Sequence, residues 1–406
     1  MDIWVPIYRI DKPGLTVIQI GRESLDPYLV HLLYGEYLVP EKVGSVPVGS
    51  LDRAIRRWEA KADLIFFRSA RLSPPAAVTR RMLMLPCYVQ QTVDLPPSTS
   101  DLLAHFHHRM TKGDLDRLRK ARFQYEITHD PETLRHYYHH LYVPYIQERH
   151  LESADIPPWP TFQTLYGDME LLLIRKDGRL VAGNVNQQIG SIYRSHVSAT
   201  LSGERDLLKA GVMSALYWFS FVEAHRRGCL EVDMGAARPF LKDGVLMYKK
   251  KWSSRLAPSI YKRDLGLWLL PCGSRPSMRR ALEDNPFFCE QDGRLTGLIF
   301  FGDHTVLNDE ELAGYLRHIF VSGESLSIWI VLLTQDWAAR AEAIRNIVDS
   351  YARAPRILDL SSGSLAELSG LLRDNSRDSM TIPVPSGSCR SCRAGVAGEG
   401  ISARLA

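Results

Sequence analysis

Apolar runs alternate with amphipathic segments from the start of the chain, and this pattern predicts a mixed α/β fold. Residues 15–21 and 63–69 have the composition of strands, and residues 51–62 between them carry apolar positions at helical spacing. Residues 82–95 are apolar and extended, and residues 98–120 are expected to be helical. These elements predict an α/β unit at the beginning of the chain.

The middle of the chain predicts an antiparallel meander followed by a long helix. Its three apolar runs, separated by short turns, are 171–176, 179–189 and 191–201. The first turn is Asp177-Gly178, a pair typical of two-residue β-hairpins. Residues 209–227 then have the spacing of a helix, and residues 229–235 are expected to form a short strand that ends in a loop.

The last third of the chain alternates regularly between uninterrupted apolar strands and amphipathic helices. Over residues 295–375 the order is β-α-β-α-β-α, which favours a small parallel sheet covered by helices. Residues 376–406 are rich in Ser, Gly, Pro and Arg without periodicity, so we expect a disordered tail.

Composition adds that this is a globular protein of more than one domain. The chain has 406 residues, of which 45% are hydrophobic and 24% are charged, and its net charge of +4 is mild. Its apolar runs fall short of the roughly 18–20 residues of a membrane span. The first residues lack a basic start followed by an apolar core, so we expect no export. Six scattered cysteines indicate reduced thiols and a cytoplasmic protein, and the lone pair Cys389 and Cys392 lacks two further metal ligands.

Basic residues are concentrated late in the middle segment. Between Arg238 and Arg263 there are eight Lys and Arg residues and one acid, Asp243, interleaved with aromatic side chains. A solvated basic face is the simpler interpretation. The alternative is a polyanionic partner such as coenzyme A or a transfer RNA.

Two features beside the long helix suit a reaction site. The turn before it would direct unpaired backbone N–H groups at an anion, with Lys209 adding charge and Gly211 allowing close approach. Glu231 and Asp233 share one face of the next strand, and two neighbouring carboxylates suit acid–base work. A capping role for Asp233, or an ion pair with Arg238 or Lys249, fits the sequence equally well.

Several stretches, which occur in the same order as in the family, resemble the GNAT superfamily of acyltransferases, in the branch related to Fem-type peptidyltransferases. The family pattern is a helix ending A-x-x-x-G-C, a strand ending D-x-G, and then G-x-x-x-(Y/F)-K-x-x-W. Here these motifs are Ala224 to Cys229, Asp233 to Gly235, and Gly244 to Trp252. The strand–turn–strand at 171–185 and the segment 115–127 are also similar.

The resemblance implies an α/β (α+β) fold with a GNAT-like mixed sheet. The expected units are 1–95, a partial N-terminal GNAT-like half; 96–265, the acyltransferase core; 295–375, a β-α-β accessory domain; and 376–406, the tail. The pyrophosphate loop of acetyl-CoA-dependent members, Arg/Gln-x-x-Gly-x-Gly/Ala, is replaced by Leu207–Val212, where only Gly211 fits well.

The resemblance also implies an activity. An acyl or aminoacyl group would pass from a thioester or ester to an amine by direct attack, without a covalent enzyme intermediate. The co-substrate would be acyl-CoA or aminoacyl-tRNA, or an acyl carrier protein thioester, with no tightly bound cofactor and no metal. The acceptor would be an amine on a small molecule, sugar or peptidyl precursor. A non-catalytic module of the same fold that binds an anionic ligand or RNA is the rival interpretation.

On this resemblance, the two strands at 191–201 and 229–235 should separate so that an activated carbonyl fits between them. Asp233, or Glu231 through a water, would accept the proton, and Tyr248 would protonate the leaving group. The expected donor-binding residues are Val197, Ala199, Lys209, Ala210, Gly211, Val212 and Lys249. The expected acceptor-binding residues are His196, Arg238 and Trp252. Core packing is the alternative for Tyr248, Trp252 and His196.

Overall fold

The structure is a computed structural model that describes most of the chain. The described residues are 4–12, 14–21, 27–69, 74, 76–98, 101–102, 106, 113–150, 154, 156–259, 266–273, 275–321, 326–348, 355–361 and 365–378. Within these residues the chain forms two compact units. The first holds the residues up to Gln90 together with Ala236–Met247 and those from Arg255 onward, and the second holds Gln91–Gly235 and Tyr248–Ser254.

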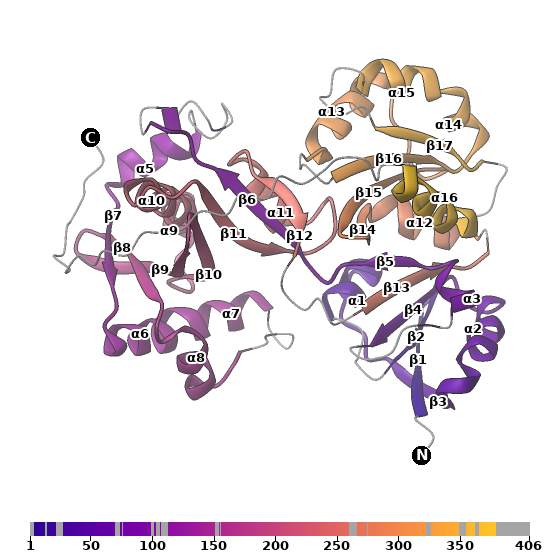
Figure 1. The fold of residues 1–406 in the computed structure, drawn as a ribbon, viewed down its shortest axis with the longest axis horizontal. Coiled ribbons are helices and arrows are strands. Elements are labelled where there is room, and N and C mark those ends of the chain that lie inside the picture. Colours follow the sequence, from indigo (N-terminus) through magenta and orange to yellow (C-terminus); the bar gives the residue numbers. More distant parts are fainter. Residues whose placement is uncertain are drawn as a thin grey trace. The chain divides into compact units, whose positions relative to one another are not determined.

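The second unit is built on a mixed sheet with helices on both faces (Figure 1). The order of the seven-stranded sheet is β12-β6-β11-β10-β9-β8-β7. The strands are β6 (Val89–Asp94), β7 (Gln124–Thr128), β8 (Glu170–Lys176), β9 (Arg179–Ile189), β10 (Ile192–Thr200), β11 (Glu231–Ala237) and β12 (Arg255–Pro258). The helices are α5 (Leu115–Ala121), α6 (Pro131–Tyr137), α7 (Val143–His150), α8 (Trp159–Tyr166), α9 (Arg205–Lys209), α10 (Val212–Arg226) and α11 (Gly244–Lys250).

The predicted meander is confirmed, because β7 to β10 pair antiparallel in sequence order. At the β8–β9 turn, Asp177 has φ 52° and Gly178 has φ 78°. Positive φ at both central residues is the geometry that an Asp-Gly hairpin favours, so this turn follows from its local sequence. Helix α6 continues through a π-helical turn, Tyr138–Tyr142, into α7.

The long helix expected at 209–227 is two helices. Helix α9 ends at Lys209, and α10 begins at Val212 after Gly211, which caps it with a left-handed φ of 91°. Only glycine adopts this backbone conformation without strain, so the helical spacing is interrupted there. Helix α10 is buried on almost every side because it packs on the sheet and is covered by Phe106, Leu118 and Trp252.

The first unit contains two sheets. The N-terminal one has the order β3-β1-β2-β4-β13-β5. Its strands are β1 (Trp4–Lys12), β2 (Leu15–Ile20), β3 (Glu41–Pro47), β4 (Leu64–Ser69), β5 (Leu83–Leu85) and β13 (Gly266–Pro271), with helices α1 (Pro27–Tyr34), α2 (Leu51–Glu59) and α3 (Ala76–Thr79). Strand β13 pairs with both β4 and β5. The unit expected at 1–95 is therefore completed by a strand from much later in the chain.

The C-terminal sheet has the order β14-β15-β16-β17. Its strands are β14 (Phe287–Gln291), β15 (Arg294–Phe301), β16 (Leu326–Leu332) and β17 (Arg356–Asp359), and its helices are α12 (Pro276–Asp284), α13 (Asp309–Ile319), α14 (Gln335–Ala339), α15 (Ala341–Val348) and α16 (Leu365–Asp378). The three strands predicted as parallel are parallel, and β14 adds an antiparallel edge.

One core joins the two sheets of the first unit. Phe66 of β4 and Leu269 of β13 belong to the same buried cluster as Phe300 of β15 and Val331 of β16. The region 295–375 is thus part of this unit, whereas the alternating pattern suggested a separate domain. A strand whose residues are apolar throughout is expected to be buried on both faces, but its sequence does not show which elements cover those faces.

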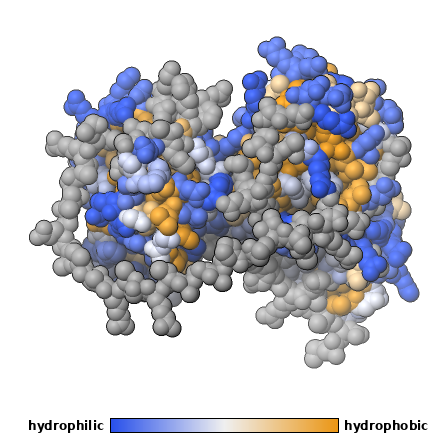
Figure 2. All heavy atoms as spheres, turned by 45° about the horizontal axis from the view of Figure 1, so that its top comes forward, coloured by the Kyte–Doolittle hydropathy of each residue, from blue (hydrophilic) through white to orange (hydrophobic). Residues whose placement is uncertain are grey.

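Several expectations lie partly or wholly outside the described residues. Of the helix expected at 98–120, the structure describes Asp101–Leu102 and α5 as helical. The tail from residue 379, with Cys389 and Cys392, lies outside, as do Lys262 and Arg263. In the part that is described, no helix has the length and apolarity to cross a membrane. On the face shown in Figure 2, hydrophilic side chains are interspersed with smaller hydrophobic areas.

The packing of the meander against α6 gives a stability prediction. A Cβ atom at Gly183 of β9 would lie 2.8 Å from the ring of the fully buried Tyr137. We expect Gly183→Ala to lower the free energy of unfolding by about 1–3 kcal/mol, because the ring must move within a packed core. Equilibrium urea unfolding measures this change.

The matched control is Gly314→Ala in α13, where no atom lies within 4 Å of the added methyl group. Alanine is the better helix former, so this change should raise the free energy of unfolding by about 1 kcal/mol. Equal effects of the two substitutions would contradict the proposed packing of Tyr137 on Gly183.

Candidate functional site

Strands β10 and β11 pair over a short distance and then part. Their parallel register joins Ile192–Arg194 to Glu231–Asp233 and ends there. Beyond Arg194, β10 continues to Thr200 along β9. The predicted separation of these two strands is thus confirmed, and it begins at Arg194 and Asp233.

His196 lies in a β-bulge at the point of separation. The register of β10 against β9 shifts between Ser195 and Val197, which leaves His196 without a partner on β9. Its Nε2 atom is buried and has no hydrogen-bond partner among the described residues. Burial, together with the Arg194 charge, lowers the pKa of His196 below its usual 6.5. The imidazole is therefore neutral at pH 7 and able to accept a proton.

Arg194 and Asp233 form a buried ion pair across the last parallel pair of residues. Arg194 Nε donates to Asp233 Oδ2 at 2.7 Å, and the Gly235 N–H donates to Asp233 Oδ1 at 2.9 Å. Asp233 is 2% exposed. Each carboxylate oxygen thus accepts a hydrogen bond, and the one from Gly235 is the capping of the following turn that the sequence offered as an alternative. A carboxylate held in this way orients Arg194.

Lys249 of α11 brings a second cation to the same place. It is 3% exposed, and its Nζ donates to the Gly235 carbonyl at 3.0 Å. Gly235 has φ 78°, and a Cβ atom there would lie 3.1 Å from the Ser195 carbonyl oxygen and 3.9 Å from Lys249 Nζ. The ammonium group therefore lies beside the point where the strands part. A positive charge at this point would favour a developing negative charge.

The start of α10 holds a hydroxyl pair. Ser214 Oγ and Tyr248 OH lie 2.6 Å apart, and burial raises the pKa of Tyr248 well above its usual range. Tyr248 therefore remains protonated at neutral pH and can act only as a proton donor toward a strongly basic group.

The other residues expected to bind the donor are divided between surface and core. Lys209 is exposed and pairs with Asp206 at 3.3 Å, so it does not cap α10. Ala210 is half-buried, whereas Val212 is fully buried in the core. The space beside Gly211 is bordered by Leu118 of α5, whose Cδ2 would lie 3.5 Å from an added Cβ. Gly211 and Val212 both lie at the start of α10, as expected.

Four further residues of the expected site lie on β10, on β11 and after α11. The side chain of Ala199 is fully buried, and the Val197 carbonyl accepts a hydrogen bond from Tyr137 OH at 3.0 Å. Trp252 is also fully buried, 5.1 Å from Phe106 between ring centroids. The expected acceptor contact of Trp252 is therefore corrected, since this ring is part of the hydrophobic core. Glu231 is half-buried and lies opposite Ile192 in the parallel register.

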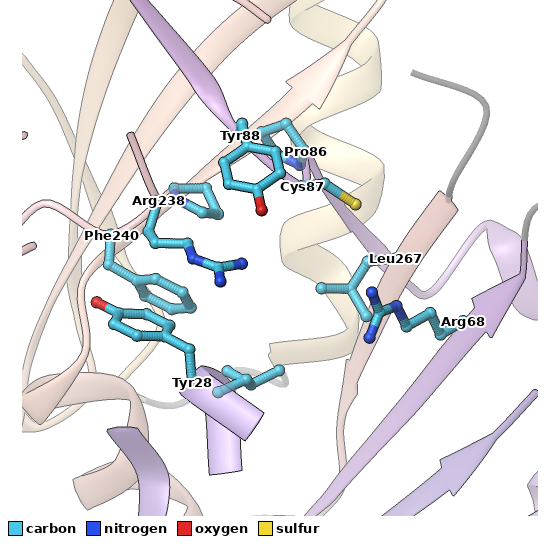
Figure 3. Close-up of a pocket in the computed structure, with 10 residues that line it drawn as sticks. Tyr28, Arg68, Pro86, Cys87, Tyr88, Arg238, Phe240 and Leu267 are labelled. Atoms are coloured by element: carbon cyan, nitrogen blue, oxygen red, sulfur yellow. The ribbon is translucent and has the colours of Figure 1, made fainter. Parts of the chain in front are cut away.

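The basic stretch does not form one solvated face within the described residues. Lys249 is buried, and burial lowers the pKa of Lys250 to about 8. Lys251 lies 3.7 Å from Asp114 and over the ring of Tyr248. Arg238 belongs to the first unit, where it lines a pocket (Figure 3). The described cations of this stretch thus differ in burial and in their neighbours, and the sequence of basic residues alone did not show these differences.

Sequence reasoning missed a buried polar network on β9 and β10. Asn184 Nδ2 donates to Asn186 Oδ1 at 2.6 Å and to Ser195 Oγ at 2.9 Å, and Ser198 Oγ donates to Asn184 Oδ1 at 2.9 Å. The two asparagines alternate within the buried part of β9, which is a signal that could have indicated the network. Arg194 was missed because its partner depends on the β10–β11 register. No cluster of metal-ligating side chains occurs among the residues that the structure describes.

The ion pair gives a second prediction. Replacing Arg194 by Met leaves the Asp233 carboxylate buried beside a neutral side chain, and we expect the free energy of unfolding to fall by about 3 kcal/mol. In Arg194→Met/Asp233→Asn the buried charge is absent and the Gly235 N–H keeps its acceptor. The double variant should therefore be more stable than Arg194→Met alone, as measured by urea unfolding at pH 7.

The control is Arg179→Met, which removes an exposed partner of Glu204 in the same unit and should cost less than about 1 kcal/mol. Equal stability of Arg194→Met and Arg179→Met would show that the Arg194–Asp233 pair does not hold the two strands.

Comparison with known proteins gives similarity at the level of solved structures. No protein-family model and no curated protein matches the chain. Among solved structures, FemX is 14% identical, with 65% of this chain and 83% of that chain covered and a TM-score of 0.36. The C-terminal domain of a putative lysylphosphatidylglycerol synthetase from Agrobacterium fabrum is 14% identical, with 66% and 80% covered and a TM-score of 0.31. A GCN5-related N-acetyltransferase from Sphaerobacter thermophilus is 13% identical, with 64% and 74% covered and a TM-score of 0.30. The mixed α/β architecture of the described residues agrees with the fold class that the sequence predicted.

Proposed function

We propose that this protein transfers an acyl or aminoacyl group from a thioester or ester donor to an amine acceptor by direct attack. The observation that carries the proposal is the separation of β10 from β11 at Arg194, with His196 unpaired in a bulge at that point. A carbonyl placed between the strands would meet a neutral imidazole, the half-buried Arg194 and the buried Lys249. The likeness to acyltransferases is consistent with this assignment of reaction class.

His196 is the proton acceptor in this proposal. The acceptor nitrogen attacks the donor carbonyl carbon, and the proton lost from that nitrogen passes to Nε2 of His196, which holds no other hydrogen bond within the described chain. Asp233 and Arg194 position the strand end next to the imidazole. Glu231, two residues before Asp233, remains a proposed second acceptor through a water. The acceptor itself is proposed to be an amine on a small molecule, sugar or peptidyl precursor.

Lys249 and Tyr248 act on the other side of the reaction. The Lys249 ammonium would stabilise the oxyanion that forms as the carbonyl is attacked. Tyr248 would protonate the leaving oxygen or sulfur when the acyl bond breaks. An alkoxide is a stronger base than a thiolate, so Tyr248 would protonate the leaving oxygen of an ester donor more readily than the leaving sulfur of a thioester.

A donor screen tests the proposal first. The purified protein is heated with acetyl-CoA, free coenzyme A, an acyl carrier protein thioester or bulk aminoacyl-tRNA, and specific binding raises the melting temperature by mass action. The donor that shifts the melting temperature is then incubated with a panel of amines, and the transferred label is counted. If no donor shifts the melting temperature and no label is transferred, the proposal fails.

Substitution of His196 then tests the mechanism. His196→Gln should lower kcat/KM about 100-fold or more because the attacking amine loses its proton acceptor, while the melting temperature stays within a few degrees. His140→Gln, at an exposed histidine of the same unit, is the matched control and should retain full activity. Undiminished activity in His196→Gln would overturn the role of His196.

The pH profile gives an independent readout. The folded protein holds His196 at a pKa below the usual 6.5, so His196 stays neutral down to more acidic pH than a free imidazole. Protonation of His196 should therefore leave kcat/KM unchanged between pH 7 and 8. It should lower kcat/KM only as the pH drops below about 6.5. The residual activity of His196→Gln should lack this acidic limb. A limb centred above pH 7 would contradict the neutral imidazole.

A further inference from the structure

A tyrosine at the end of α8 packs against the imidazole of His196. The ring centroids of Tyr166 and His196 lie 5.9 Å apart, and the ring planes are tilted by 55°. Tyr166 is the last residue of α8, which lies with α6 and α7 on one side of the sheet (Figure 1). Because β8 and β9 separate α8 from β10 along the chain, this contact exists only in the folded protein.

Two features of α8 fix the place of the Tyr166 ring. The ring of Phe162, one helical turn earlier, lies 4.7 Å from it in an edge-on arrangement, and Phe162 is fully buried. The helix ends directly after Tyr166, where the Gly167 N–H donates to the Gln163 carbonyl at 2.7 Å. A Cβ atom at Gly167 would lie 2.6 Å from that carbonyl oxygen, so the turn is as tight as glycine allows. Tyr166 is therefore anchored well enough to support a neighbouring side chain.

The imidazole of His196 needs such support. It lies in a bulge, and its buried Nε2 atom has no hydrogen-bond partner among the described residues. The charged groups that act on it are Arg194 on the same strand and Asp233 on β11, which shift its pKa in opposite directions. From α8 it meets the Tyr166 ring, which remains uncharged because burial raises the pKa of the phenol. Burial has a larger effect on the pKa of His196 than either charge.

We propose that Tyr166 is a positioning residue for the transfer reaction, whose ring holds the His196 imidazole at the point where β10 and β11 part and keeps water from it. The catalytic part of this inference rests on the proposed function. Exclusion of water keeps the imidazole neutral, since burial disfavours its charged form. A fixed imidazole also presents the Nε2 lone pair to the attacking amine in one orientation. Tyr166 thus acts through His196 and exchanges no proton itself.

The titration of His196 tests the contact without any substrate. Nuclear magnetic resonance of the full chain follows the imidazole signal, which is assigned by its loss in His196→Gln. In the unmodified protein it should titrate below pH 6.5. In Tyr166→Ala water reaches the ring, so the pKa of His196 should rise toward its usual 6.5. Tyr166→Phe keeps the ring and should titrate as the unmodified protein does.

The matched control is Leu165→Ala, at the preceding position of the same helix, where the side chain is 51% exposed. It removes an apolar side chain from α8 without touching the Tyr166 ring, so the pKa of His196 should stay the same. If Tyr166→Ala does not fold, Tyr166→Leu is used, because it fills more of the space while still lacking the aromatic ring. The same rise in the pKa of His196 is expected there.

Kinetics test the positioning role with the donor and amine that the screen identifies. Tyr166→Ala should lower kcat about tenfold or more, because the proton acceptor is no longer held in place, while KM for the donor changes less than about twofold. The acidic limb of kcat/KM should move to higher pH, together with the pKa of His196. Tyr166→Phe should restore both kcat and the position of the limb.

Two results would overturn the inference. One is a pKa of His196 that is the same in folded Tyr166→Ala, or in its Leu replacement, as in the unmodified protein. The other is undiminished kcat in that variant. A lower melting temperature with an unmoved acidic limb would likewise show a structural role only. If no donor supports transfer, the proposed function fails, whereas the titration still decides whether Tyr166 shields His196.

Discussion

The buried ion pair between Arg194 and Asp233 determines the arrangement of the second unit around its candidate site. It lies at the last residue pair of the parallel β10–β11 register, and beyond it the two strands diverge. Removing two charges from water is costly, and here the cost is offset by a 2.7 Å contact and by the Gly235 N–H on the other carboxylate oxygen. Because the pair needs both strands in this register, it fixes where the separation begins.

The other groups of the candidate site follow from that position. The bulge at His196 lies two residues beyond Arg194. The imidazole therefore lies on the part of β10 that no longer pairs with β11. Lys249 reaches the Gly235 carbonyl on the opposite strand. The neutral base, the buried ammonium group and the anchored arginine thus occur together because one register places them together. Their separation in sequence hides this relation.

The first unit shows how a chain can combine segments far apart in sequence into one core. Strand β13 enters the N-terminal sheet between β4 and β5, and Phe66 and Phe300 from different sheets share one apolar cluster. The pocket that Arg238 lines arises in the same way, since Tyr28, Arg68 and Arg238 come from three separate segments.

The sequence alone determined those features that depend on neighbours in the chain. The Asp177-Gly178 hairpin, the meander and the parallel strands of the C-terminal sheet all follow from local periodicity and turn chemistry. Only the tertiary structure decided which groups meet: Asp233 with Arg194, Trp252 with the core, and residues 295–375 with the N-terminal sheet. The physical reason is that strand register and burial depend on the partner surface, and no run of residues specifies its partner. The sequence does not distinguish a charged side chain that is solvated from one that forms an ion pair or lines a pocket.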